Sequence, residues 1–189
     1  MRKTRLLMLN TAFILLSACG LTEVKPYQMQ SFTFMNQNEQ SFGTDNLKGK
    51  VWIANFIFTN CDTVCPPMTA NMAALQKKLK EENIGVELVS FSVDPAADTP
   101  RKLKTYIANF TEDESNWNML TGYTQQEIEW FGREEFQTLI QKPKSSDQVI
   151  HNTNLYLVNK DGEIVNEYIF TSGTNSEEII NDVKKLVSK

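Results

Sequence analysis

The order of apolar and polar residues predicts buried strands that alternate with amphipathic helices. Residues 51–58 are nearly all apolar and rich in strand-forming side chains, and a second buried strand is expected at 86–93. Runs of this length without polar alternation are typical of central strands covered on both faces. Between them, apolar residues recur at spacings of four, three and four, at Met68, Met72, Leu75 and Leu79. This spacing predicts an amphipathic helix.

Capping signals predict three further helices. Thr99 is a candidate N-cap for a helix over 100–110, with proline at the first helical position. Thr124 and Glu127 have capping-box spacing and predict the start of another. The last helix is expected at 176–187, because its acidic residues lie in the first turn and its lysines near the last, which complements the helix dipole.

Turn signals predict the remaining strands. A hairpin is expected within 32–42, a short strand at 117–120, and a second hairpin from 155–158 to 164–168, around an Asn-Lys-Asp-Gly turn. The polar stretch 139–149 is expected to form a mobile loop. Strands alternating with helices indicate the α/β class, and we expect a central mixed sheet with helices on both faces and an N-terminal hairpin.

Composition narrows the class of protein. The 189 residues suffice for one domain with a sizeable core, and the formal net charge is −4. Nucleic-acid binders usually carry an excess of basic residues, whereas acidic residues outnumber basic ones here. No nucleic-acid partner is therefore expected.

The N-terminus is similar to a bacterial lipoprotein signal. Three basic residues within the first five precede an apolar run at 6–16, which is shorter than the ~20 residues of a membrane-spanning helix. The run ends in Leu-Ser-Ala-Cys-Gly, which resembles a lipobox with Cys19 as the lipidated residue. The alternative is that Cys19 is a small residue beside an ordinary cleavage site.

These features predict the organisation and location of the chain. We expect a signal peptide at 1–18, a lipidated Cys19 with a tether at 19–28, and a folded domain at 29–189. The domain is then held at the extracytoplasmic face of the cell membrane through the lipid.

Two cysteines remain for chemistry once Cys19 is assigned to lipid. Cys61 and Cys65 follow the first buried strand and open the next helix, where residues four apart share a face with Cβ atoms ~5–6 Å apart. Their sulfurs can converge on one metal or form a disulfide. The positive end of the helix dipole is expected to favour the thiolate of both. A purely structural disulfide is the other interpretation, but so small a loop constrains the unfolded chain little.

His151 is the single histidine of the chain. A lone histidine is more often a surface or core residue than a ligand, but this one lies between the polar loop and a strand, where loops surround the site of an α/β sheet. Two thiolates and one imidazole suit copper in both oxidation states. Structural zinc usually takes four protein ligands, and Asp62 or Asp94 could supply the fourth, so zinc stays open.

Three stretches of the chain resemble the Sco/SenC family. They are the Gly-Lys-Val-Trp-Ile-Ala-Asn-Phe-Ile-Phe-Thr-Asn-Cys-Asp-Thr-Val-Cys-Pro segment at 49–66, Phe-Ser-Val-Asp-Pro followed by Asp-Thr-Pro, and His151 ahead of Tyr-Leu-Val and Asp-Gly. The resemblance runs from about residue 25 to the C-terminus. It implies a thioredoxin-like fold, copper held by Cys61, Cys65 and His151, and assistance in assembling the CuA centre of cytochrome c oxidase. The implied partner is the oxidase subunit that carries CuA.

The resemblance also bears on two neighbouring residues. Asp94 matches the aspartate of the family's Val-Asp-Pro motif and is either a support of the site from outside the copper ligands or a turn residue before Pro95. Asn60 departs from the family, because many relatives carry histidine before the first cysteine. The core motif is intact.

The cysteine pair also suits a redox function. An oxidising compartment would close the Cys61–Cys65 disulfide, so an extracytoplasmic thioredoxin-like reductant is an expected partner. The alternative function is a thiol–disulfide oxidoreductase that reduces the cysteines of the target copper site, with Cys61 attacking and Cys65 resolving. General oxidoreductases of this fold usually carry Cys-x2-Cys, and they have no need of His151.

Overall fold

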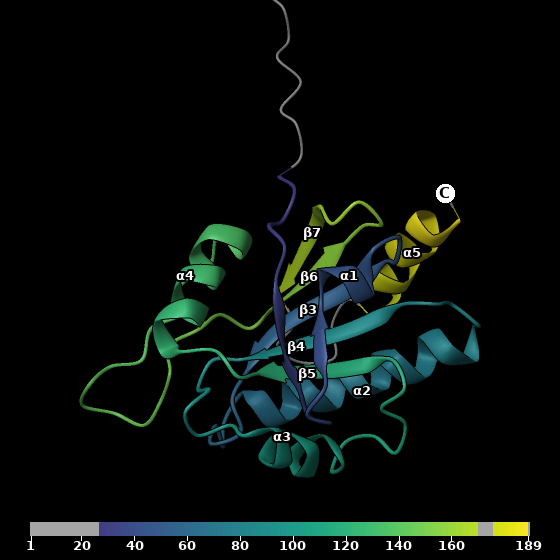
Figure 1. Ribbon diagram of the computed structural model, residues 1–189. Helices are drawn as coiled ribbons and strands as arrows, with labels where there is room; N and C mark the ends of the chain where they lie inside the picture. Colours follow the sequence, from purple (N-terminus) through teal and green to yellow (C-terminus); the bar gives the residue numbers. More distant parts are fainter. Residues whose placement is uncertain (1–26, 170–175, 189) are drawn as a thin grey trace, which may run out of the picture.

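The computed structural model describes residues 27–169 and 176–188 (Figure 1). The expected signal peptide at 1–18, the lipidated Cys19 and most of the expected tether therefore lie outside the described residues. The first described residues contact the domain: the Tyr27 hydroxyl donates to the Glu135 carboxylate at 3.1 Å, and Gln28 forms an isolated bridge with Glu163.

The strands form one mixed sheet in the order β2-β1-β5-β4-β3-β6-β7. Their bounds are β1 Thr33–Asn36, β2 Ser41–Gly43, β3 Trp52–Ile57, β4 Glu87–Ser92, β5 Trp117–Thr121, β6 Asn154–Val158 and β7 Ile164–Ile169. β3, β4 and β5 run parallel, and the remaining pairings are antiparallel. The predicted central strands, the short strand and both hairpins are confirmed.

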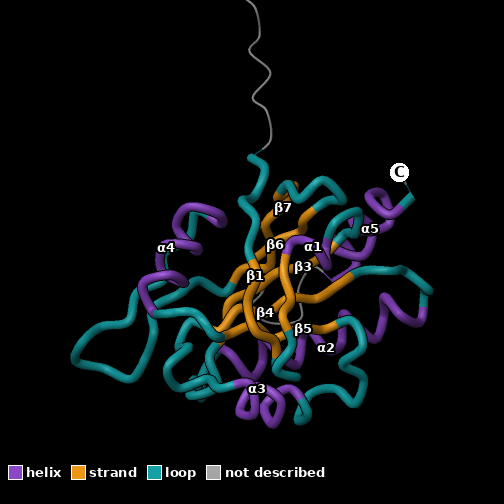
Figure 2. Tube along the Cα trace, in the orientation of Figure 1, coloured by secondary structure: helices purple, strands orange, loops and turns teal. Residues whose placement is uncertain are grey.

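Helices cover both faces of this sheet (Figures 1 and 2). Their bounds are α1 Thr44–Leu47, α2 Cys65–Glu81, α3 Pro100–Ile107, α4 Gln125–Phe136 and α5 Ser176–Val187. Side chains of α2, α3 and α5 share one buried cluster, and those of α4 belong to the cluster on the other face. The predicted α/β class with helices on both faces is confirmed.

The two faces have different cores. One is aromatic, with the rings of Phe56, Phe91, Phe131 and Phe136 at centroid distances of 5.1–5.7 Å. The other is mainly aliphatic and contains the predicted stripe residues Met72, Leu75 and Leu79. Alternate residues of β3 point into each cluster, so every residue of that strand is buried. This explains why its sequence is apolar without alternation.

Caps begin the helices where the sequence places them. The Thr99 hydroxyl accepts from the Lys102 N–H at 3.3 Å, and Thr124 forms a complete capping box with Glu127. The bounds of α5 coincide with those predicted. α1, a single turn of four residues, was not predicted. None of the helices that the structure describes combines the length and the hydropathy of a membrane span.

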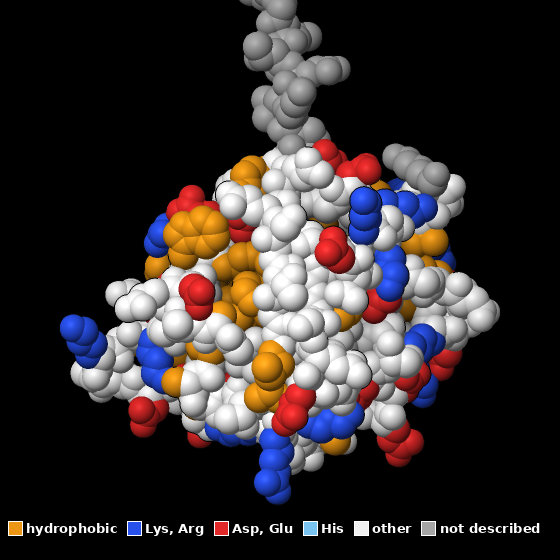
Figure 3. All heavy atoms as spheres, in the orientation of Figure 1, with side chains coloured by type: hydrophobic (Ala, Val, Ile, Leu, Met, Phe, Trp, Pro, Cys, Tyr) orange, Lys and Arg blue, Asp and Glu red, His pale blue; other side chains and the backbone are white. Residues whose placement is uncertain are grey.

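Charged side chains of both signs are interspersed on the face drawn in Figure 3. Several ion pairs join exposed partners, such as Lys77 with Glu81 at 3.9 Å. Exposed pairs contribute about 0–1 kcal/mol each. The pair between Lys142 and Asp94 differs, because the Asp94 side chain is 1% exposed and lies 2.6 Å from the lysine Nζ.

Candidate metal centre

β3 and α2 place the two cysteines. Cys61 lies in the loop after β3, and Cys65 is the first residue of α2, followed by prolines that need no hydrogen-bond partner in a first turn. The backbone N–H of Cys65, unpaired within the helix, donates to the Cys61 Sγ at 3.4 Å. Both cysteines are buried and free. The loop and the helix start therefore bring the thiols together without a disulfide.

The two thiols differ in acidity. Burial raises the pKa of Cys61, but hydrogen bonds from Cys65 and Thr63 outweigh it and leave that pKa below its usual value. For Cys65, burial dominates and raises the pKa far above the usual value, with the nearby Cys61 and Asp98 adding to it. The expectation that the helix N-terminus favours both thiolates is wrong for Cys65, because it packs into the aromatic cluster.

His151 reaches the pair from a segment 86 residues further along the chain, just before β6. Its Nε2 lies 3.7 Å from the Cys65 Sγ, and its Nδ1 lies 2.6 Å from the carbonyl oxygen of Asn152. A carbonyl only accepts, so Nδ1 carries the proton and Nε2 turns its lone pair toward the sulfur. Burial lowers the pKa of His151, which favours the neutral imidazole at neutral pH. The phenyl ring of Phe58 packs edge-on against it.

The donor set fits a soft metal ion. Two sulfurs and one unprotonated imidazole nitrogen are copper ligands, and the backbone bond at Nδ1 is the kind of outer contact that orients a ligating histidine. Within 27–169 and 176–188, no three His, Cys, Asp or Glu side chains already stand close enough to hold a metal ion. The recorded contact between a thiol and the imidazole is the one from Cys65 Sγ to His151 Nε2, at 3.7 Å.

Asp94 lies beyond the end of β4. Its Oδ1 accepts from Lys142 Nζ at 2.6 Å, and its backbone N–H donates to the Ser92 hydroxyl at 3.2 Å. Its carbonyl oxygen accepts from the N–H groups of Ala97 and Asp98, which closes a turn. The carboxylate thus contacts the loop that carries His151. Within the part of the chain that the structure describes, it forms no hydrogen bond or ion pair with Cys61, Cys65 or His151.

Asp98 is a site residue that the sequence reasoning missed. Its fully buried carboxylate accepts from the Thr59 hydroxyl at 2.5 Å, the Thr59 N–H at 3.1 Å and the Ser92 hydroxyl at 2.6 Å. Burial raises its pKa, although these bonds and the charge of Lys102 act to lower it. It holds the backbone two residues before Cys61. The Asp-Thr-Pro motif was the available signal, but it indicated a helix start rather than this contact.

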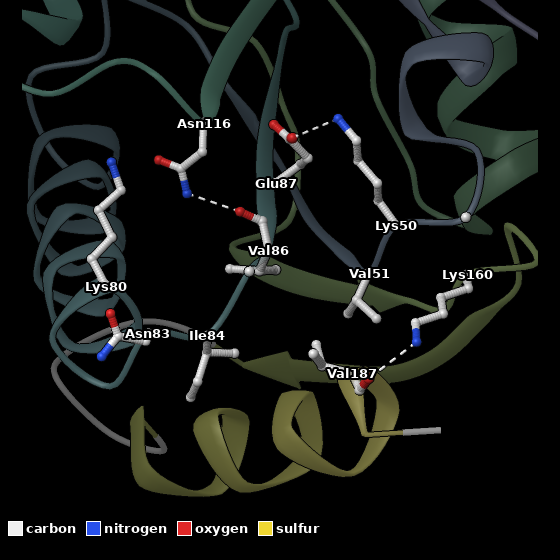
Figure 4. A pocket seen from close by; sticks show the side chains of 12 residues that line it. Lys50, Val51, Lys80, Asn83, Ile84, Val86, Glu87, Asn116, Lys160 and Val187 are labelled. Atoms are coloured by element: carbon white, nitrogen blue, oxygen red, sulfur yellow. Dashed lines mark hydrogen bonds and ion pairs between the residues drawn. The ribbon is translucent and has the colours of Figure 1, made fainter.

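A hollow of about 600 Å³ lies at the other end of β3, away from the cysteines (Figure 4). Three lysines line it, and each has a partner: Lys50 pairs with Glu87, Lys80 with Asp113, and Lys160 donates to a carbonyl at the end of α5. Its residues include none of Cys61, Cys65 and His151. The thiol and imidazole chemistry is therefore separate from this hollow.

Residues 22–188 match the family model described as SCO1/SenC. The chain belongs to the SCO1/SenC family. The crystal structure of a SCO1/SenC family lipoprotein from Bacillus anthracis str. Ames is 53% identical, with a TM-score of 0.83, over 86% of this chain and 98% of that one.

Two further structures extend the comparison within the SCO1/SenC family. One is BsSco, a member of the Sco family of cytochrome c oxidase assembly proteins, and a disulfide switch was identified in BsSco itself. It is 48% identical, with a TM-score of 0.80, over 87% of this chain and 95% of that one. Arabidopsis thaliana ScoI with copper bound is 25% identical, with a TM-score of 0.72, over 84% of this chain and 99% of that one. The predicted thioredoxin-like fold is confirmed.

Proposed function

We propose that this protein is a copper metallochaperone that assists assembly of the CuA centre of cytochrome c oxidase. It holds copper through Cys61, Cys65 and His151, at the extracytoplasmic face of the membrane to which Cys19 anchors it. The observation that carries the proposal is the Nε2 of His151, which turns its lone pair toward the Cys65 sulfur at 3.7 Å. Family membership and the copper bound to Arabidopsis ScoI support the choice of metal.

The chemistry of the three donors explains why copper is suitable cargo. Thiolates favour copper(I), and imidazole is accepted by copper(II), so one set of ligands serves both oxidation states. Cys61 loses its proton more easily than Cys65, because the pKa of Cys61 is lowered. Cys65 must lose its proton when the metal binds, since burial keeps its pKa raised. Copper capture is therefore expected to release protons and to strengthen as the pH rises.

Delivery requires a partner that takes the cargo and another that keeps the thiols reduced. The recipient is the oxidase subunit that carries CuA, to which copper passes by ligand exchange. An extracytoplasmic thioredoxin-like reductant opens the Cys61–Cys65 disulfide when it forms, because a disulfide leaves no thiolate for the metal. The disulfide switch identified in BsSco supports a redox cycle in this pair.

Copper titration of the reduced 189-residue chain in detergent tests the proposal. We expect one tight equivalent with thiolate-to-copper charge transfer, weakened or spectrally altered in His151→Ala. Ser145→Ala is the matched control, because Ser145 is an exposed residue of the same loop. Equal copper affinity and identical spectra in wild type and His151→Ala would refute His151 as a ligand.

The difference in pKa between Cys61 and Cys65 favours a second function, that of a thiol–disulfide oxidoreductase. The Cys61 thiolate would attack a target disulfide, form a mixed disulfide and release one target thiolate. Cys65 would then lose its proton and attack the Cys61 sulfur, leaving a Cys61–Cys65 disulfide and a reduced target after transfer of two electrons. Reductase activity that survives in His151→Ala, with no stable copper site in wild type, would move the assignment to this enzyme.

A further inference from the structure

Two buried carboxylates stand at the ends of one short turn, between the two halves of the candidate site. Asp98 holds the end of β3 through Thr59, two residues before Cys61. Asp94, four residues earlier, holds Lys142 in the loop that leads to His151. The turn is closed by the bond from the Asp98 N–H to the Asp94 carbonyl at 2.9 Å. This turn thus contacts both the segment just before Cys61 and the loop that leads to His151.

A short backbone path leads from Lys142 to His151. The residue before Lys142, Gln141, exchanges two backbone hydrogen bonds with Ile150, at 3.0 and 2.9 Å. Ile150 directly precedes His151. Any shift of Lys142 therefore moves this bridge between Gln141 and Ile150 and, with it, the backbone of the histidine.

The other contacts of this loop lead mainly to α4. The Lys142 N–H donates to Glu129 at 3.0 Å, and Ile140 packs so closely on Gly132 that an added Cβ there would lie 2.5 Å from the Ile140 Cδ1. Toward the cysteine loop, the Gln148 amide reaches the Asn60 carbonyl at 3.5 Å, which is long for a hydrogen bond. The short ion pair with Asp94 is the stronger tie between the loop and the turn beside the thiols.

We propose that Lys142 is a positioning residue: its ion pair with Asp94 pins the His151 loop to the Asp94–Asp98 turn and so sets how far the imidazole stands from the two thiols. Asp94 then acts on copper through Lys142 and the loop. Lys142 itself does not touch the metal. The copper part of this inference rests on the proposed function, whereas the loop part concerns the metal-free protein alone.

A double variant, Asp94→Asn with Lys142→Met, is the appropriate perturbation. Removing one partner of a buried ion pair leaves an uncompensated charge and can unfold the protein, but removing both is much milder. Lys142→Arg keeps the charge and is the rescue variant. Lys144→Met is the matched control, because Lys144 is an exposed lysine of the same loop.

Hydrogen exchange of the reduced, metal-free 189-residue chain in detergent is measured first. In the double variant we expect the amides of Gln141 and Ile150 to exchange at least about tenfold faster, since a charge-assisted hydrogen bond no longer holds the loop. The amides of β3 should keep their rates, and Lys142→Arg and Lys144→Met should match wild type. Unchanged exchange at Gln141 and Ile150, or an equal acceleration in β3, would overturn the proposal.

Copper dissociation into a chelator, followed by the copper absorption spectrum, is the second measurement. We expect dissociation at least about tenfold faster in the double variant, with the charge-transfer band altered, and wild-type behaviour in Lys142→Arg. A looser loop with unchanged copper release and spectrum would refute the positioning role. If wild type binds no copper, the proposed function fails, while the exchange experiment still decides whether Lys142 pins the loop.

Discussion

Replacing Thr59 by valine removes one hydroxyl from the end of β3 and leaves the shape of the side chain almost unchanged. The hydroxyl donates to the buried Asp98 carboxylate at 2.5 Å, while the Thr59 N–H keeps its own bond to Asp98 at 3.1 Å. Ser92 also continues to donate to the carboxylate. The substitution therefore tests a single contact that holds the backbone just before Cys61.

The expected loss of stability follows from the type of bond. A hydrogen bond to a charged group contributes about 1.5–3 kcal/mol. In a domain of this size, 1 kcal/mol shifts Tm by about 2–4 °C. Thr59→Val should thus lower the free energy of unfolding by about 1.5–3 kcal/mol and Tm by about 3–12 °C.

The loss should depend on pH in a defined direction. Burial raises the folded-state pKa of Asp98 above the usual 3.8, so this group favours folding at low pH and loses that contribution as the pH rises through the folded pKa. The Thr59 hydroxyl acts to lower that pKa, and its removal raises the pKa further. The penalty of Thr59→Val should therefore be largest above the folded pKa and shrink as Asp98 becomes protonated.

Thermal and urea unfolding of the reduced protein at several pH values measures this penalty. Thr105→Val is the matched control, because the Thr105 hydroxyl is exposed and bonds to a carbonyl of its own helix. We expect the control to change stability by less than about 0.5 kcal/mol. A Thr59→Val penalty equal to that of the control, or one that does not change with pH, would refute the assignment of Asp98 as a charged anchor of the cysteine loop.

Three further outcomes are expected. In the reduced protein at pH 7, iodoacetamide should alkylate Cys61 more than tenfold faster than Cys65, because the pKa of Cys61 is lowered and that of Cys65 raised; peptide mass spectrometry that found equal rates would contradict this. Cys19→Ser should move the protein from the membrane to the soluble fraction, and retention at the membrane would argue against lipid anchoring. Met72→Ala should lower the free energy of unfolding by about 2–5 kcal/mol in urea, since Met72 is fully buried, and a loss below 1 kcal/mol would show that the site repacks.

Elements with strong local signals could be predicted from the sequence. Thr99 and Thr124 act as caps where their spacing predicted, because capping depends on residues within one turn. The run at 51–58 is a strand buried on both faces, as its lack of polar alternation indicated. α1 escaped prediction because a single turn has no apolar periodicity to recognise.

The fine chemistry of the site depends on contacts that no local pattern records. The raised pKa of Cys65 arises from burial in the aromatic cluster, which the helix position alone cannot reveal. Asp98 meets Thr59 across 39 residues, and Lys142 meets Asp94 across 48. In the sequence, each of these four residues looks like an ordinary polar residue of a loop or turn. The two members of each pair meet only when the sheet is packed.

X-ray absorption spectroscopy of the copper-loaded chain tests the central claim most directly, because it reports the atoms bound to the metal. The account predicts two sulfur neighbours and one imidazole nitrogen in the wild type, with the imidazole signal lost in His151→Ala and the sulfur signal kept. A copper ion with no sulfur neighbours, or an imidazole signal that persists in His151→Ala, would contradict the assignment of Cys61, Cys65 and His151 as its ligands.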